Sequence, residues 1–227
     1  MPDPATQPAP RGVPRRTRRK EARPAEVIEA ARDLFIARGY AATKLEEVAR
    51  RAGVSVGLPY LYFENKEGLL KAVVRESLMP LFETGEEMLE RFPGSSHELF
   101  CLLGAKFWEM EQSPNGGLLK LVIAEGTNFP DIARFYMDEV ILRGRRFVVR
   151  LLERGIARGE FRPMDVEQMA RVIVAPLAML SLNHHSFGAY EPDPAKADAG
   201  AYLAAYFDLL LHGLRAESGP SSQGQPS

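Results

Sequence analysis

The sequence is poor in cysteine and has no long hydrophobic run. Cys101 is the one cysteine among 227 residues, so no disulfide can form within the chain, and its apolar neighbours favour a buried structural thiol. No apolar segment follows the basic N-terminus, so we expect no secretory signal. The longest nearly apolar run, 172–182, is too short to span a bilayer. We therefore expect a cytoplasmic protein with no membrane partner.

Motifs of enzymes and of metal or cofactor sites are also missing. The sequence has no glycine-rich phosphate loop, no His-x-x-x-His pair and no paired cysteines. The adjacent pair His184-His185 is a poor bidentate metal site, because neighbouring helical residues point about 100° apart. The alternatives for this pair are a polar contact in a pocket, or a helix end facing solvent or a partner subunit. We expect no catalytic residues, no metal and no cofactor.

The net charge of −1 is unevenly distributed along the chain. Residues 1–70 carry 13 basic against 9 acidic side chains, and the remaining residues carry 16 against 21. A basic front suggests an anionic partner for that part. Residues 1–23 are rich in proline and arginine and predict a disordered basic arm, which either contacts DNA or is a solvated tail. Residues 217–227 predict a second disordered tail.

Between the tails the hydrophobic pattern is helical throughout, and no segment has the alternation of a strand. The sequence predicts an all-α fold. Its first helix begins at Pro24 and ends at Gly39, the second begins at Thr43 with a capping box to Glu46, and a short third covers 54–62. Asn65 caps the helix that follows. The later helices are expected at 66–79, 80–92, 96–113, 117–127, 131–158, 166–186 and 196–215.

Three residues between the second and third helices predict a helix-turn-helix. Ala49 is small enough for two helices to cross closely, Gly53 permits a positive φ in the turn, and Pro59 is the apolar residue that faces the core. Val54 fills the turn. This spacing alone is weak evidence, but the surrounding sequence is specific: GYAAT at 39–43, LEEVARRAGVS at 45–55, Gly57, and YLYFENKEGLL at 60–70.

This stretch resembles the DNA-binding domain of the TetR family of transcriptional regulators over about residues 24–72. The resemblance implies a three-helix DNA-binding domain at 24–70, followed by a larger helical domain at 71–216 for ligand binding and dimerisation. It also implies a homodimer whose recognition helices enter successive major grooves of a palindromic operator. Repression, relieved by a small organic effector that favours another spacing of the two DNA-binding domains, is the output usual in this family, and activation is the alternative.

The resemblance also implies roles for individual residues. The hydroxyl of Thr43 and the free N–H groups beside it would hold a phosphate, and Lys66 would contact the DNA backbone. The hydroxyls of Tyr60 and Tyr62 would reach phosphates, with core packing as the alternative for both rings. The groove-facing start of the recognition helix would comprise Ser55, Val56, Gly57 and Leu58.

Two residues depart from the family pattern. Val56 stands where a lysine is usual, so base recognition would use Ser55, the tyrosine hydroxyls and contacts of Val56 or Leu58 with thymine methyl groups. Pro59 lies inside the recognition helix, which predicts a helix that is bent or begins late.

A helical domain that senses an organic ligand needs an apolar cavity with a few polar groups. Glu111 and Glu125, if buried, would favour a cationic or hydrogen-bonding ligand. The alternative is that the aromatic residues and Met179 fill the core. The candidate ligand contacts are Phe107, Trp108, Glu111, Phe135, Tyr136, Met179, Asn183 and His184.

The segments 166–186 and 196–215 are too apolar for burial on one side, which agrees with the family's four-helix dimer interface. Two other functions remain open at this point. One is a helical adaptor that uses the N-terminal domain for protein contacts. The other is a DNA-binding protein that responds to no effector and has little sequence preference.

Overall fold

The computed structural model describes residues 15–193 and 198–216, with side chains from Pro24 onward. These residues form helices joined by turns, and the single isolated β-bridge among them, between Phe161 and Arg215, is not part of a strand. The predicted all-α fold is confirmed. Within the same residues no helix is long and apolar enough to cross a membrane.

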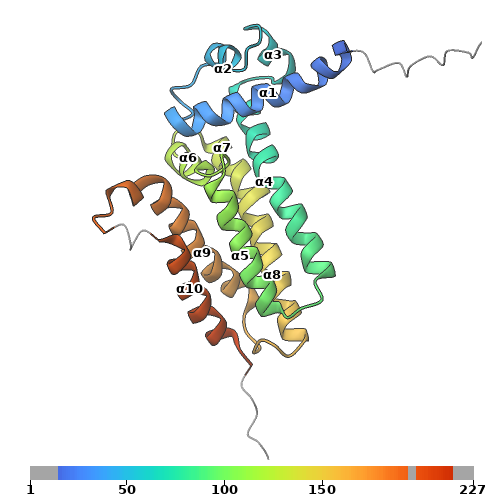
Figure 1. Cartoon of the computed structure of the whole chain (residues 1–227), viewed down its shortest axis with the longest axis vertical. Helices are drawn as coiled ribbons and strands as arrows, with labels where there is room; N and C mark the ends of the chain where they lie inside the picture. The colour runs from blue at the N-terminus through green and yellow to red at the C-terminus, as the bar shows by residue number, and fades with distance from the viewer. Residues whose placement is uncertain (1–14, 194–197, 217–227) are drawn as a thin grey trace, which may run out of the picture.

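The N-terminal helices form one end of an elongated molecule (Figure 1). They are α1 (Arg15–Arg38), α2 (Leu45–Arg51) and α3 (Leu58–Tyr62), and they pack with the start of α4 (Lys66–Arg91). The apolar residues that recur at helical spacing in α1 are buried there. Removing one such side chain from water contributes about 1.5–3 kcal/mol. The buried set includes Val27, Ile28, Ala31, Leu34, Phe35, Val48 and Leu69.

Two predicted helix starts were wrong. α1 begins at Arg15 and passes through Pro24, because the arginine, lysine, glutamate and alanine residues before the proline are good helix formers. Nine residues of the predicted disordered arm are therefore helical, and the other fourteen lie outside the described residues, as does the predicted tail at 217–227. In α2 the carboxylate of Glu47 accepts the Lys44 N–H at 3.2 Å, so the cap lies one residue later than predicted.

The larger domain holds the remaining helices. α4, α5 and α8 run along its length, α9 and α10 cover one side, and α6 and α7 lie beneath α1 (Figure 1). The helices are α5 (Ser96–Gln112), α6 (Leu118–Glu125), α7 (Pro130–Tyr136), α8 (Leu142–Ala157), α9 (Val166–Leu182) and α10 (Ala199–Leu214). Two π-helical turns, η1 (Met137–Ile141) and η2 (Asn183–Phe187), and a 3₁₀ turn, η3 (Gly188–Tyr190), complete it.

Pro80 does not end a helix, contrary to the prediction. α4 continues through it to Arg91, because buried Leu78 and Leu89 fix the helix on both sides and only one backbone donor is lost. The start of α4 is as predicted, since the side chain of Asn65 accepts the Gly68 N–H at 2.8 Å. α4 is therefore one long helix that belongs to both domains.

The buried apolar side chains form two clusters. The first joins the N-terminal helices to α6 and α7 through Leu118, Leu121 and Ile132. The second lies between α5, α8, α9 and α10 and includes Leu99, Leu152 and Ile173. The core of the N-terminal domain thus crosses residue 70 and includes part of the larger domain, so a displacement of α6 or α7 must alter the support of α1.

Candidate functional site

The turn between α2 and α3 has the geometry predicted from Ala49 and Gly53. Ala49 is fully buried where the helices meet, and Gly53 has a φ of +66°. The Val54 N–H donates to the Ala49 carbonyl at 3.0 Å, and Val54 itself packs against the first core cluster. A residue with a Cβ at position 53 would be strained by this φ alone, since no atom lies within 4 Å of the added carbon.

Pro59 is accommodated in the first turn of α3. The helix begins at Leu58, after a turn in which the Leu58 N–H donates to the Ser55 carbonyl at 2.9 Å. Pro59 therefore takes the second helical position, where its missing N–H costs no intrahelical hydrogen bond. The recognition helix begins late, as the sequence predicted, and spans five residues.

The exposed surface of α3 differs from the prediction at two leucines. Leu58, expected to face the groove, is buried in the first core cluster and cannot contact a base. Leu61, which was not predicted, is 79% exposed. Its spacing of four residues from exposed Gly57 is the signal that could have identified it. Ser55, Val56, Tyr60 and Tyr62 are exposed as predicted, so neither tyrosine ring fills the core.

Thr43 and Lys66 support the fold of the α1–α2 turn. Thr43 is 1% exposed and its hydroxyl donates to the Gly39 carbonyl at 2.8 Å, so the predicted hydroxyl–phosphate contact was wrong. The Nζ of Lys66 donates to the carbonyls of Tyr40, Ala41 and Thr43 at 2.8, 3.2 and 3.1 Å. Its ammonium also lies 4.4 Å from the Tyr40 ring centroid. Burial lowers the pKa of Lys66, and the Glu125 charge opposes that shift. In this structure its side chain holds the turn, and its contact with the DNA backbone stays a prediction.

The same turn is tied to the larger domain by Glu125, at the end of α6. The Ala41 N–H donates to Oε1 of Glu125 at 3.1 Å. Gly39 has a φ of +87°, and a Cβ there would lie 3.1 Å from the same oxygen. Glu125 was predicted as a ligand contact if buried, but its oxygen accepts a backbone hydrogen bond from the N-terminal domain.

A second tie joins α1 to the turn between α5 and α6. Arg32 donates to Oδ1 of Asn115 at 3.2 Å, and also pairs with Asp33. Asp33 in turn pairs with Arg51 of α2 at 2.7 Å. Burial raises the pKa of the Asp33 carboxyl, but hydrogen bonds and charge from Arg51 and Arg32 outweigh it and leave the pKa below its ordinary value. The orientation of α2 is thus connected through α1 to the larger domain.

Behind that turn lies a buried polar cluster around Glu111. Glu111 is 4% exposed, and its Oε2 accepts the Ser181 hydroxyl at 2.8 Å and lies 2.9 Å from Nε2 of His185. Burial and the Glu111 charge raise the pKa of Tyr136 strongly. Glu111 and Tyr136 were predicted as ligand contacts, a polar contact was one alternative given for the pair His184-His185, and Ser181 was missed. Ser181 and His185 are four residues apart and therefore share a helical face, which was the available signal.

Glycines allow this cluster to approach α1. A Cβ on Gly116 would lie 2.8 Å from Nε2 of His185, and one on Gly117 would lie 3.3 Å from Cγ2 of Ile36 and 3.5 Å from Nδ1 of His185. The turn therefore separates the His185 ring from α1 by little more than a backbone. Tyr136 directly precedes η1 and His185 lies in η2, and π-helical turns of this kind are frequent at functional sites.

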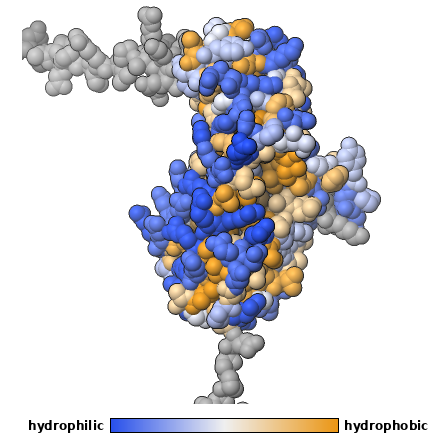
Figure 2. Space-filling view, turned by 180° about the vertical axis from the view of Figure 1, so that it is seen from behind, coloured by the Kyte–Doolittle hydropathy of each residue, from blue (hydrophilic) through white to orange (hydrophobic). Residues whose placement is uncertain are grey.

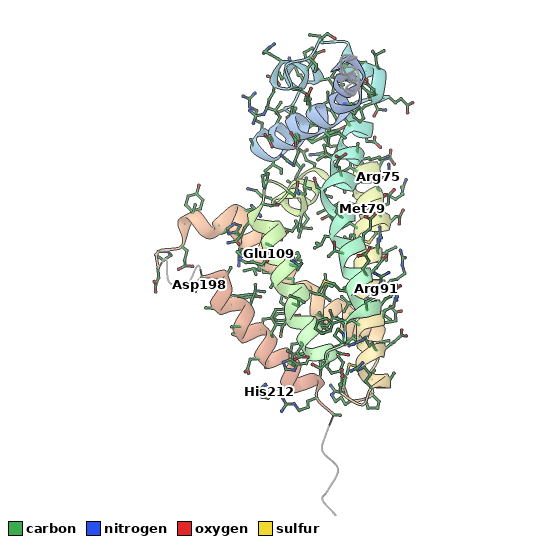
Figure 3. The ribbon with its side chains drawn as sticks, turned by 45° about the vertical axis from the view of Figure 1, so that its right-hand side comes forward. Arg75, Met79, Arg91, Glu109, Asp198 and His212 are labelled. Atoms are coloured by element: carbon green, nitrogen blue, oxygen red, sulfur yellow. The ribbon has the colours of Figure 1, made fainter. Side chains whose placement is uncertain are left out.

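Two of the other predicted ligand contacts, His184 and Trp108, lie beside the Glu111 cluster, because the His184 ring meets the His185 ring edge to face at 4.7 Å. The Trp108 ring meets His184 edge to face at 4.9 Å, and Met179 and Asn183 are exposed. Phe135 belongs to the first core cluster, and Phe107 is half-buried on α5. Phe135 also lies beneath the cations of Lys71 and Arg75. Arg75 pairs with Glu139 on the outer edge of α4 (Figure 3).

α9 and α10 leave an apolar face uncovered in this single chain. Leu209 of α10 is 76% exposed, and Val172 and Met179 of α9 are also exposed. Asp198 and His212 mark the two ends of α10 in Figure 3. In Figure 2 hydrophobic side chains gather at mid-height on the side of α6 and α9, whereas hydrophilic ones cover the edge of α4 and α8. The described residues contain no group of three or more metal-ligating side chains.

Two family models match this chain. Bacterial regulatory proteins of the tetR family match residues 27–73, and the tetracyclin repressor-like C-terminal domain matches residues 97–199. The HTH-type transcriptional repressor KstR2 of Mycolicibacterium smegmatis is 28% identical over 150 residues, 65% of this chain and 72% of that protein. The fatty acid metabolism regulator protein of Bacillus subtilis is 24% identical over 190 residues, 83% of this chain and 94% of that protein.

Solved structures share the whole architecture. FadR from Bacillus subtilis in complex with stearoyl-CoA superposes with a TM-score of 0.65 at 22% identity, covering 84% of this chain and 99% of that one. Reduced NemR from Escherichia coli gives a TM-score of 0.70 at 18% identity, covering 86% and 98%. The helix-turn-helix, the helical second domain and the family models lead to one conclusion: the chain belongs to the TetR family of bacterial transcriptional regulators.

Proposed function

We propose that the chain is a transcriptional repressor that binds a palindromic operator as a homodimer and is released by a small organic effector. As a TetR-family regulator it is not an enzyme. The observation that carries the proposal is the pair of hydrogen bonds between the two domains. The Ala41–Glu125 and Arg32–Asn115 hydrogen bonds join the DNA-binding domain to the end of α6 and to the turn before α6, and that turn lies against the buried Glu111 cluster.

The DNA-binding part of the proposal depends on the exposed surface of α3. Ser55, Val56, Gly57, Tyr60 and Tyr62 face solvent, and α3 would enter the major groove. The α9 and α10 faces of two copies would form the dimer and set the spacing of the two recognition helices. We place the protein in the cytoplasm, where the operator is.

An acyl-CoA is the effector class that we propose. The support is the likeness to the Bacillus subtilis regulator, which binds stearoyl-CoA in its solved structure. The buried carboxylate of Glu111 would repel the carboxylate of a free fatty acid and would not repel a neutral thioester.

Release would follow from a two-state equilibrium. An effector that separates α6 from α5 and α9 shifts the turn 113–117 and Glu125, and so alters the support of α1 and the α1–α2 turn. Operator affinity then falls by the ratio of the effector's affinities for the two states.

The test is fluorescence anisotropy of the dimer with its own upstream intergenic DNA and with a scrambled duplex, across a salt series. The proposal predicts preference for the native duplex, steep weakening with salt through counterion release, and release by stearoyl-CoA. An adaptor would bind neither duplex. An effector-independent DNA-binding protein would bind both alike and ignore stearoyl-CoA.

A further inference from the structure

The exposed apolar side chains of α3 and of the turn before it indicate which chemical group of the operator DNA this surface recognises. We infer that Leu61 and Val56 select operator half-sites by contacting the 5-methyl groups of thymine in the major groove. The inference rests on the proposed operator binding and adds the base specificity that the proposal leaves open.

The exposure of Leu61 serves no packing purpose in the free chain. Leu61 is 79% and Val56 is 53% exposed, although Leu58 and Pro59 of the same short segment are buried. Leu58 anchors α3 to the first core cluster, so the position of the helix that carries Leu61 is defined. An apolar side chain held at a surface that enters the major groove is suited to contact the thymine methyl group.

The surface lacks the side chains that recognise other bases. Arginine or lysine usually recognises guanine, asparagine or glutamine recognises adenine, and a carboxylate recognises cytosine. Residues 52–63 contain none of these. The hydroxyl of Tyr60 donates to Glu46 at 3.3 Å, so the hydroxyls of Ser55 and Tyr62 are the exposed polar groups left to turn to the groove. The thymine methyl is the apolar group on a base edge in the major groove.

Lys44 and Arg50, beside and in α2, are exposed, but three other cations near the helix-turn-helix are engaged elsewhere in the described structure. Arg51 pairs with Asp33, Arg38 pairs with Glu47 at 3.4 Å, and Lys66 donates to three backbone carbonyls. They would not readily extend across α3 to a guanine. Within residues 52–63, methyl contacts of Val56 and Leu61 would therefore supply the apolar part of base recognition, beside the hydroxyls of Ser55 and Tyr62.

Gly57 allows the close approach that methyl contacts require. It lies one helical turn before Leu61 on the exposed side, and no atom lies within 4 Å of a Cβ built on it. Its φ of −76° suits any residue, so the fold does not require glycine here. Its lack of a side chain lets the α3 backbone approach the base edges.

Replacement of single thymines by deoxyuridine in the operator duplex removes the methyl group and keeps the base pair. For each contacted thymine, operator affinity should fall about three- to fivefold, as expected for losing one buried methyl. In the Leu61→Ala protein the same replacement should have almost no effect at the thymine that Leu61 contacts. Leu102→Ala, at an exposed leucine of α5, is the matched control and should keep the full deoxyuridine effect.

The outcomes separate this inference from the proposed function. Specific binding that no deoxyuridine weakens, or an equal deoxyuridine effect in Leu61→Ala and wild type, overturns methyl recognition and leaves the repressor proposal intact. Equal binding to the native and scrambled duplexes overturns both.

Discussion

The backbone N–H of Ala41 donates a hydrogen bond to Oε1 of Glu125 across 3.1 Å, and this bond joins the α1–α2 turn to the end of α6. Lys66, at the start of α4, donates to the carbonyls of the same turn. Three segments distant in sequence therefore meet at the point where the helix-turn-helix leaves the larger domain. A displacement of α6 would therefore be transmitted to the helix-turn-helix through the α1–α2 turn.

Replacing Glu125 should weaken operator binding without unfolding the protein. Glu125→Ala removes the acceptor for Ala41 and leaves the turn less firmly placed, so we expect operator affinity to fall about 5- to 20-fold, within the usual range of coupling energies. Glu125→Gln keeps an Oε1 acceptor and should bind nearly as well as wild type. Anisotropy and thermal melting of both variants test this, and equal affinity for all three proteins would contradict it.

Neutralising Glu111 should change which effector the protein accepts. Glu111→Gln keeps the shape of the side chain and an oxygen for the Ser181 hydroxyl, but removes the negative charge. A fatty acid carboxylate is then no longer repelled. We expect stearate to release the variant from the operator at a concentration at least about tenfold below that needed for wild type, since one buried charge contributes several kcal/mol. Identical stearate responses would show that Glu111 does not face the effector.

The exposed leucine of α10 should be required for dimerisation. Leu209→Glu places a charge on the uncovered α9 and α10 face, so sedimentation at micromolar concentration should show a monomer. Leu61→Glu is a matched control, because that leucine is as exposed but lies on α3. It should remain dimeric and lose operator binding. A dimeric Leu209→Glu protein would place the interface elsewhere.

Acid should destabilise the N-terminal domain partly through Asp33. Its pKa is lower in the folded chain than the ordinary aspartate value of about 4, so its ionised form stabilises the fold above that pH. This contribution is lost as the pH falls through the lowered folded-state pKa. Asp33→Asn should therefore lower the melting temperature slightly at neutral pH, and the gap to wild type should shrink towards pH 2. Because Asp33 is partly exposed, the effect is that of a screened ion pair. A gap that is constant with pH would contradict it.

Adding one methyl group at Gly104 should destabilise the larger domain. A Cβ there would lie 2.0 Å from Cζ of Phe207, whose ring is buried between α5 and α10. Gly104→Ala should cost about 1–3 kcal/mol of unfolding free energy, as overpacking usually does. Gly213→Ala meets no atom within 4 Å and serves as the control in urea unfolding. Equal stability of the two variants would show that the α5–α10 packing is looser than described.

Features set by local chemistry could be predicted from the sequence. Ala49, Gly53 and Asn65 define a crossing, a turn and a cap that depend on near neighbours, and each has the predicted environment. Pro59 also has a local explanation, since a proline early in a helix delays its start. The family resemblance extended these local signals to the architecture of the second domain.

Features set by tertiary contacts could not be predicted. The hydroxyl of Thr43 faces inward because the carbonyl of Gly39 lies within reach, and Lys66 is drawn to three carbonyls of a distant turn. Leu58 is buried and Leu61, for which no role was predicted, is exposed, because α3 begins only at Leu58 and packs that residue against the core. His185, rather than His184, meets Glu111 because it shares the face of Ser181 at the end of α9.

The most direct test of effector-controlled operator binding is the linkage between the two ligands. Stearoyl-CoA affinity is measured for the free dimer and for the dimer saturated with operator, and operator affinity is measured with and without saturating stearoyl-CoA. The account predicts that each ligand weakens the other by the same factor, as reciprocal coupling requires. Operator and stearoyl-CoA binding with no mutual effect would contradict it.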